Sequence, residues 1–445
     1  MKKTTAKIIK RASLLLLLVL TVCTLASCFT GGSEIIYSKD ALTENIINET
    51  DLQKSSVSDY IDSWNFPLFA SSRLTEVENL FEDNFYKELP SAYEAASLTA
   101  ARFIDNYYDK LDLNDKDAVT DALITCYVDV VGDKYSVFRT PVEYDDYSTN
   151  MSGMVGGIGV SARKSEDGLI EIVEVTRGGS AEAAGILAGD LIYKVDGKTV
   201  GELGGYDSAV NSITGEIGTY VQLDLLRATE EISLTVERKS IPKQSVRYAM
   251  DDTGIGYIRI ESFKSNTDEQ FCEAIEYMKA NGARGIIYDL RNNYGGYLSS
   301  VKNMLSYIAP KGMTLVSFSN DYDDPYICSD SHTYFVPTVV LCNYNTASAA
   351  ELFTAGIRDI ANMGYFEAKL VGVTTRGKGI MQNTYSLSGG ASLTLTVAYY
   401  NPPSGKNYHE SGITPDVEIE ASTEGDAQLV AAYDQICKMA PNSAN

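Results

Sequence analysis

The sequence is poor in histidine, and this shortage limits the kinds of active site that it can form. Two histidines, His332 and His409, occur among 445 residues. They share no motif with each other or with a nearby cysteine, and no Cys-x-x-Cys pair occurs. The sequence therefore argues against a zinc site and a histidine-rich redox metal site, and we expect no metal and no cofactor.

Positive charge is also scarce. The chain has 37 Lys and Arg against 60 Asp and Glu, for a net charge of −23. A surface this acidic repels nucleic acid, so we exclude a nucleic-acid partner. The length favours about two or three domains, and the apolar and charged fractions are those of an ordinary globular protein.

The apolar run near the N-terminus is short. Leu14–Val22 falls well below the ~20 residues that a membrane span needs, and it follows a cluster of positive charges: Lys2, Lys3, Lys7, Lys10 and Arg11. The tetrad Leu25-Ala-Ser-Cys28 resembles a bacterial lipobox. We expect residues 1–27 to be a lipoprotein signal peptide and Cys28 to be lipidated, which would tether the protein to the outer face of the cell membrane. A plain secretory signal cut near Ala26 is the alternative.

The five cysteines beyond the N-terminal segment are odd in number and widely spaced. They are Cys126, Cys272, Cys328, Cys342 and Cys437, and most have apolar neighbours in the sequence. Buried free thiols are the favoured interpretation, and a disulfide stays open.

Helix signals dominate the first part of the expected mature chain. Residues 28–90 are predicted to be a tether and an irregular, weakly helical segment, and residues 91–150 a helical module. Two apolar stripes within 91–131 predict helices, and Thr140-Pro141 predicts the cap and first residue of a third.

Residues 151–240 change to short strands with two short helices. The segment resembles a PDZ domain over its whole length, with Gly156, Gly157, Ile158, Gly159 and Val160 at the position of the carboxylate-binding loop. Backbone N–H groups at such a turn can hold an anion, and the next strand can pair with an added peptide. A phosphate-binding loop is the competing interpretation, but no Gly-Lys-Ser/Thr and no βαβ unit accompany these glycines.

Residues 241–420 alternate strands with helices, which predicts an α/β layer. Buried strands are expected at 255–260, 285–290, 338–341 and 369–373, a polar hairpin at 382–400, and an edge strand after Gly412-Ile-Thr-Pro-Asp416. Residues 421–445 are predicted to be a weakly helical tail.

One serine has the setting of a nucleophile. Ser348 stands where the apolar run Val339–Leu341 gives way to a helical pattern, and thirty residues later Lys378 lies between two glycines. A serine needs a base, and a desolvated lysine with a lowered pKa can serve as one. Gln382 could hold the amine. Alternatives are a solvated surface lysine, and His332 or His409 as the base.

A glycine turn, Gly295-Gly296, lies between a buried strand and a helix. Backbone N–H groups there and at Ala349 could stabilise an oxyanion. A tight turn without chemistry is the other interpretation.

Taken together, four motifs resemble those of the carboxyl-terminal processing proteases, Ser/Lys-dyad peptidases of the S41 type. The motifs are Asp289-Leu-Arg-Asn-Asn-Tyr-Gly-Gly296, Asn345-Thr-Ala-Ser-Ala-Ala-Glu351, Gly377-Lys-Gly-Ile-Met-Gln382 and Gly412-Ile-Thr-Pro-Asp416, with the PDZ-like segment ahead of them. The resemblance covers about residues 90–420. It implies Ser348 as nucleophile, Lys378 as general base with Gln382 beside it, and Ala349 with Gly295 or Gly296 as oxyanion donors.

The same resemblance implies the fold: an α/β, crotonase-like protease core with an inserted PDZ domain that binds substrate C-termini. Three departures stand out. Thr346 and Ala350 replace serines that flank the nucleophile, Tyr294 replaces the usual proline of the glycine turn, and Arg376 stands where an aromatic residue often precedes Gly-Lys-Gly.

We therefore expect a membrane-tethered, extracytoplasmic serine endopeptidase that acts on polypeptides through an acyl-enzyme. An activating partner or a homo-oligomer could control it. A non-catalytic PDZ lipoprotein adaptor is the rival, and acyl-CoA chemistry is a third interpretation that the export signal opposes.

Overall fold

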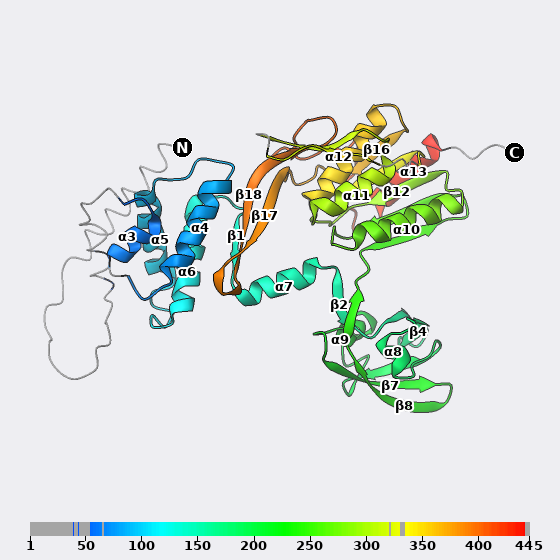
Figure 1. Ribbon diagram of the computed structural model, residues 1–445. Coiled ribbons are helices and arrows are strands. Elements are labelled where there is room, and N and C mark those ends of the chain that lie inside the picture. The colour runs from blue at the N-terminus through cyan, green and yellow to red at the C-terminus, as the bar shows by residue number, and fades with distance from the viewer. Residues whose placement is uncertain are drawn as a thin grey trace. The chain divides into compact units, whose positions relative to one another are not determined.

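The computed structural model describes Lys39, Thr43 and residues 54–64, 66–319, 322–329 and 334–440 (Figure 1). The chain divides into two units, residues 1–49 and residues 50–445. The second unit contains the helices α3–α13 and the strands β1–β19. The expected signal peptide, the lipidation site Cys28 and His332 lie outside the described residues. In the described part, no helix has both the length and the apolar character needed to cross a bilayer.

Four helices form a bundle at the start of this unit. They are α3 (Val57–Ser63), α4 (Ser71–Asn84), α5 (Ala92–Asn106) and α6 (Lys116–Val131). The pairs α3–α4, α3–α5, α4–α6 and α5–α6 are in contact. The helical module therefore reaches back well before residue 91, because Tyr60, Trp64 and Phe81 are fully buried. Polar residues separate these aromatic side chains in the sequence and obscure the pattern.

The predicted third helix begins as its sequence requires. In α7 (Pro141–Met151) proline is the first helical residue, and Thr140 and Glu143 form a reciprocal capping box. Before it, α6 ends at Gly132, which has a left-handed φ of 79°.

The segment after α7 contains two small sheets. Strand β2 (Met154–Gly157) pairs with β9 (Lys239–Pro242). The second sheet has the order β3-β4-β5-β7-β8, with β6 beside β5. Its elements are β3 (Val160–Lys164), β4 (Ile170–Val175), α8 (Ser180–Ala183), β5 (Leu191–Val195), β6 (Lys198–Thr199), α9 (Tyr206–Ile213), β7 (Tyr220–Arg227) and β8 (Glu230–Glu237). Alternate residues of the strands fill one apolar core, and the predicted short strands and two short helices are confirmed.

Another six-stranded sheet has the order β10-β11-β12-β15-β16-β19, and all its pairs except β10–β11 are parallel. Its strands are β10 (Val246–Met250), β11 (Ile255–Ile260), β12 (Gly285–Asp289), β15 (Thr338–Cys342), β16 (Ala368–Gly372) and β19 (Val417–Glu418). The helices α10 (Thr267–Ala280), α11 (Leu298–Ile308) and α12 (Ala349–Asn362) bury one face of it.

A second, mainly antiparallel sheet joins the helical bundle to this core. It has the order β1-β18-β13-β14, with β17 paired to β18. Its strands are β1 (Val137–Arg139), β13 (Thr314–Phe318), β14 (Tyr326–Ile327), β17 (Ile380–Ser386) and β18 (Ser392–Asn401). The hairpin β17–β18, orange in Figure 1, carries the lysine motif at its base.

The structure corrects the prediction that the C-terminal segment is a weakly helical tail. Helix α13 (Ala427–Met439) covers the other face of the mainly parallel sheet, and Ala432 and Ile436 are completely buried there. Successive strand residues explain the two faces, since Val340 points to the first core and Val339 and Leu341 to the second. Residues 427–439 are thus part of an α/β/α layer.

The five cysteines in the described part are free thiols. Cys126, Cys328 and Cys342 are buried, and burial raises the pKa of Cys126 and of Cys342 to about 12. These two are inert at neutral pH.

Candidate active site

Ser348 lies at a sharp turn between the loop after β15 and the start of α12. Its φ of 57° and ψ of −121° lie in a region that residues with a side chain rarely occupy. The surroundings hold it there, since Ala347 N–H donates to the Asn293 carbonyl at 3.0 Å and Leu352 N–H donates to the Ser348 carbonyl at 3.0 Å. Such a strained turn presents a serine hydroxyl at the head of a helix.

A buried carboxylate joins the serine segment to the lysine segment. Glu351 has no exposed surface, and its Oε2 accepts from Ser348 N–H at 2.9 Å and from Lys378 N–H at 2.7 Å. Its Oε1 accepts from Gly377 N–H at 2.6 Å and from the Thr375 hydroxyl at 2.5 Å. Sequence reasoning missed this role. The signal was present, because Ser348-x-x-Glu351 is the spacing of a capping box.

Lys378 and Gln382 meet as the sequence predicted. The Lys378 Nζ donates to Gln382 Oε1 at 2.7 Å, and Gln382 Nε2 in turn donates to the Tyr135 carbonyl. The amine also lies 5.0 Å from the centroid of the Tyr135 ring. The amine is thus held between β17 and the loop that precedes β1.

The surroundings of Lys378 lower its pKa from the ordinary value of 10.5. Burial is the main cause, and the positive charge of Arg376 acts in the same direction, while Asp133 and Glu351 oppose it. A lysine with a lowered pKa is more often neutral, which is the form that can accept a proton.

Two buried tyrosines bind the backbone carbonyl groups of Lys378 and Ser348. The Tyr400 hydroxyl donates to the Lys378 carbonyl at 3.1 Å, and the Tyr408 hydroxyl donates to the Ser348 carbonyl at 3.5 Å. Burial raises the pKa of both phenols, so they stay protonated donors. Among the described residues, no hydrogen bond joins Lys378 Nζ to Ser348 Oγ, and the amine donates to Gln382.

The glycine turn packs directly on Ser348. A Cβ on Gly295 would lie 2.8 Å from Ser348 Cβ and 2.9 Å from Ala349 N, and a Cβ on Gly296 would lie 1.9 Å from the Phe263 carbonyl oxygen. Only glycine fits at either position. The N–H of Gly295 donates to Asn293 Oδ1 at 2.9 Å, whereas the N–H groups of Gly296 and Ala349 have no partner within the described residues. The N–H groups of Gly296 and Ala349 are therefore the remaining candidates for stabilising an oxyanion.

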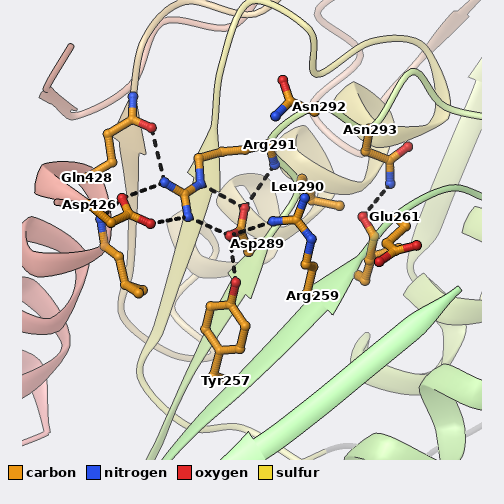
Figure 2. A network of polar contacts seen from close by, with 12 residues as sticks. Tyr257, Arg259, Glu261, Asp289, Leu290, Arg291, Asn292, Asn293, Asp426 and Gln428 are labelled. Carbon is orange, nitrogen blue, oxygen red and sulfur yellow. Dashed lines mark hydrogen bonds and ion pairs between the residues drawn. The ribbon is translucent and has the colours of Figure 1, made fainter. Parts of the chain in front are cut away.

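A network of charged side chains surrounds the residues that lead into this turn (Figure 2). Asp289, at the end of β12, accepts from Tyr257 at 2.7 Å, from Arg259 at 3.2 Å and from Arg291 at 2.7 Å. Arg291 also binds Asp426, the residue that caps α13, at 2.7 Å. Figure 2 shows the Arg291 guanidinium between the two carboxylates. The C-terminal helix is thereby fixed to the residues that lead into the turn.

His409 lies beside two tyrosines. Its ring lies 5.4 Å from that of Tyr399 and 6.0 Å from that of Tyr135, and burial lowers its pKa. No hydrogen bond joins it to the serine in the described part of the chain, and its buried Nδ1 has no partner there.

The predicted carboxylate-binding loop is shorter than the sequence suggested. Gly156 and Gly157 lie within β2. A Cβ on Gly156 would clash with Gly215, and a Cβ on Gly157 would clash with Ile241, so both positions need glycine for close packing. Ile158 and Gly159 then lead into Val160, the first residue of β3. Gly159 has a φ of 77°, and its carbonyl and that of Ile158 accept from Thr176 and Ala181 N–H groups.

No group of three His, Cys, Asp or Glu side chains that could hold a metal ion occurs among the described residues.

Comparison with known proteins supplies the family. A model of peptidase family S41 matches residues 254–419, and a PDZ-domain model matches residues 156–237. The carboxy-terminal processing protease CtpA of Bacillus subtilis is 33% identical over 341 residues, which are 76% of this chain and 70% of that protein. The chain belongs to the carboxy-terminal processing proteases of peptidase family S41.

Other carboxy-terminal processing proteases show similar coverage. A Staphylococcus aureus protein named "Probable CtpA-like serine protease" is 29% identical over 395 residues, 86% of this chain and 78% of the relative. The solved structure of a photosystem II D1 C-terminal processing protease is 24% identical and covers 83% of this chain and 97% of its own, with a TM-score of 0.45. The chain is a CtpA-like serine protease with a mixed α/β fold and a PDZ domain.

Proposed function

We propose that the protein is an extracytoplasmic endopeptidase that cleaves polypeptides with a Ser348/Lys378 dyad. The observation that carries the proposal is the convergence of both segments on Glu351, which binds the backbone of the serine and of the lysine. The lowered pKa of Lys378 supports its role as a base. The crotonase-like character of the core belongs to this proposal, supported by parallel strands that alternate with α10, α11 and α12.

The first half of the reaction forms an acyl-enzyme. Neutral Lys378 turns from Gln382 and takes the proton of the Ser348 hydroxyl as Oγ bonds to the scissile carbonyl carbon. The carbonyl oxygen gains the negative charge, which the N–H groups of Ala349 and Gly296 stabilise. The intermediate collapses as the carbon–nitrogen bond breaks, and Lys378 passes its proton to the leaving amine.

The second half restores the enzyme. Water adds to the ester carbon while Lys378 accepts its proton. The bond from carbon to Ser348 Oγ then breaks, and Oγ takes the proton back from Lys378. No cofactor is needed, because every proton released is taken up within the cycle.

The PDZ domain is proposed to capture the polypeptide before cleavage. The edge strand β3 can pair with an added strand, and the turn Ile158–Gly159 can bind a terminal carboxylate. Residues 1–27 as signal peptide and Cys28 as lipid anchor would place this activity at the outer face of the cell membrane. The domain limits predicted from the sequence remain proposals, with two changes. The helical module begins at α3, and α13 belongs to the protease core.

Cleavage of an unfolded protein tests the proposal. The full chain in detergent is incubated with casein beside Ser348→Ala and Lys378→Ala, and fragments are followed by mass spectrometry. We expect each variant to lose about 1,000-fold or more in rate. Equal cleavage by all three forms would sink the dyad, and no cleavage by any form would favour the peptide-binding adaptor.

A further inference from the structure

Arg376 stands at the boundary between the serine and lysine segments, two residues before the proposed base. Its backbone N–H donates to the Thr346 carbonyl at 3.1 Å, and the next N–H, of Gly377, donates to the buried Glu351. The backbone is therefore fixed on both sides of an exposed side chain. The guanidinium has a defined starting point close to Ser348.

The guanidinium lies over an aromatic ring. Its central carbon is 5.3 Å from the ring centroid of Tyr344, a residue with 62% of its surface exposed in the loop that leads to Ser348. A guanidinium that stacks on a ring keeps the N–H groups at its edge free to bind another molecule. We name this pair, Arg376 and Tyr344, the guanidinium stack.

Arg376 has no acidic partner among the described residues, unlike Arg227 and Arg291. In the part of the chain that the structure describes it forms no ion pair, whereas Arg227 and Arg291 hold carboxylates at 2.8 and 2.7 Å. The chain carries a net charge of −23, so partners are abundant. An arginine held in place and left without a carboxylate beside an active site suits a carboxylate from outside.

We propose that the guanidinium stack is a carboxylate-binding subsite, which makes the protease prefer substrates with a carboxylate group close to the scissile bond. This inference rests on the proposed peptidase function. The carboxylate can come from an Asp or Glu side chain or from a nearby chain terminus. The stack pre-orders the arginine, so less side-chain entropy is lost when the carboxylate binds.

The subsite is distinct from an effect of charge on the base. Arg376 also repels the protonated form of Lys378, so its removal will slow cleavage of every substrate. A subsite for carboxylates must in addition change the ratio of rates between acidic and neutral substrates. That ratio is the quantity to measure.

The experiment uses a fluorogenic peptide whose cleavage site in the wild-type protein has been mapped by mass spectrometry. Asp, Asn and Lys replace each residue that flanks the scissile bond, and each peptide is made as free acid and as carboxamide. The full-length protein is compared with Arg376→Gln, Arg376→Lys and Tyr344→Leu. Lys369→Gln is the charge-matched control, because Lys369 is exposed on β16.

For wild type we expect kcat/KM about three- to tenfold higher for the carboxylate-bearing peptide than for its neutral match at one position or at the terminus. Arg376→Gln should abolish this ratio, Arg376→Lys and Tyr344→Leu should reduce it, and Lys369→Gln should leave it intact. High salt should lower it, since the site is exposed.

A preference confined to free acids over carboxamides identifies a chain terminus as the carboxylate, and a preference for Asp over Asn identifies a side chain. Cleavage of all peptides at matched rates by wild type, or an equal ratio in Arg376→Gln, overturns the subsite and leaves the peptidase function standing. Failure to find any peptide that the wild-type protein cleaves overturns both.

Discussion

The residues closest to the chemistry are held through the backbone of their partners. Glu351 accepts from the N–H groups of Ser348 and Lys378, and Tyr400 and Tyr408 donate to the carbonyls of the same two residues. The serine and lysine backbones are thus fixed from two sides, and the proposed mechanism requires only the lysine side chain to turn from Gln382 to the serine. Buried acceptors with several donors are costly to disturb, so this part of the site should be rigid.

The pH dependence of cleavage reports the lysine. In the proposed mechanism the base is neutral Lys378, so kcat/KM should rise with pH through a midpoint below the ordinary lysine value of 10.5. The positive charge of Arg376 lowers the pKa of Lys378, and Arg376→Gln should therefore move this midpoint upward. The profile of a neutral peptide substrate, measured with wild type, Arg376→Gln and Lys369→Gln, checks this. A midpoint that stays in place or moves down in Arg376→Gln would show that the arginine does not act on the lysine.

The backbone of Ser348 should store measurable strain. At a φ of 57° and a ψ of −121°, glycine is at ease and alanine is not. Relief of strain should exceed the extra entropy of glycine in the unfolded chain, so Ser348→Gly should be about 1 kcal/mol more stable than Ser348→Ala. Chemical unfolding of the two variants, neither of which can digest itself, gives the comparison. Equal stability would mean that the turn is relaxed.

At the scale of elements, regular patterns were readable and long-range contacts were not. Strand β11 and the start of helix α7 follow the sequence prediction to the residue, because an apolar run and a cap followed by proline mark them locally. Helix α13 was predicted only as a weakly helical tail, although Leu429, Tyr433 and Ile436 recur at helical spacing and pack into one cluster. Its place on the sheet depends on Val339 and Leu341, almost a hundred residues earlier, which no local pattern reveals.

In the candidate site, too, some residues were predicted from the sequence and some contacts were not. Ser348, Lys378 and Gln382 were predicted, because each stands in a motif and chemistry names its partner. The hydrogen bond from Gly295 N–H to the Asn293 side chain was not, since it depends on the conformation of the turn. Nor were Tyr400 and Tyr408, which a strand and a loop bring under the serine from beyond the lysine motif.

The attachment of α13 should be electrostatic in part. Asp426 caps the helix and binds Arg291, and the hydrogen bond to Arg291 is the main cause that lowers the pKa of Asp426. A carboxyl group with a lowered folded-state pKa stabilises the fold above its unfolded value, near 3.8, and loses this contribution as pH falls through the folded value.

Asp426→Ala should accordingly cost about 1–2 kcal/mol at neutral pH through the lost cap and ion pair. The difference from wild type should shrink below about pH 3.8, where the wild-type carboxyl group also takes up a proton. Unfolding midpoints at several pH values measure this, with Asp434→Ala, an exposed residue of the same helix, as the control. A cost for Asp426→Ala that does not change with pH would assign the effect to capping geometry alone.

At the scale of the whole molecule, one domain is proposed to capture the chain that the other cleaves. Tyr206, the first residue of α9, donates its hydroxyl to the Ala162 carbonyl of the edge strand β3 at 3.0 Å. This bond occupies an acceptor on the edge that an added peptide strand would use.

Tyr206→Phe should free that acceptor and tighten peptide binding about two- to fivefold. In the Ser348→Ala background, fluorescence anisotropy of a labelled peptide with a free C-terminus measures the affinity. In the active background KM should fall while kcat stays unchanged. Weaker binding by Tyr206→Phe would mean that the hydroxyl contacts the peptide itself.

The central claim is that Lys378, as a neutral amine, is the base for Ser348. Lys378→Arg tests it most directly, because a guanidinium keeps the positive charge and cannot lose its proton in a protein. Initial rates of cleavage of one mapped peptide are measured for wild type, Lys378→Arg and Ser348→Ala. We predict that Lys378→Arg falls to the level of Ser348→Ala, about 1,000-fold or more below wild type. Retention of a substantial share of the wild-type rate by Lys378→Arg would contradict the dyad, since the lysine would then contribute only its charge.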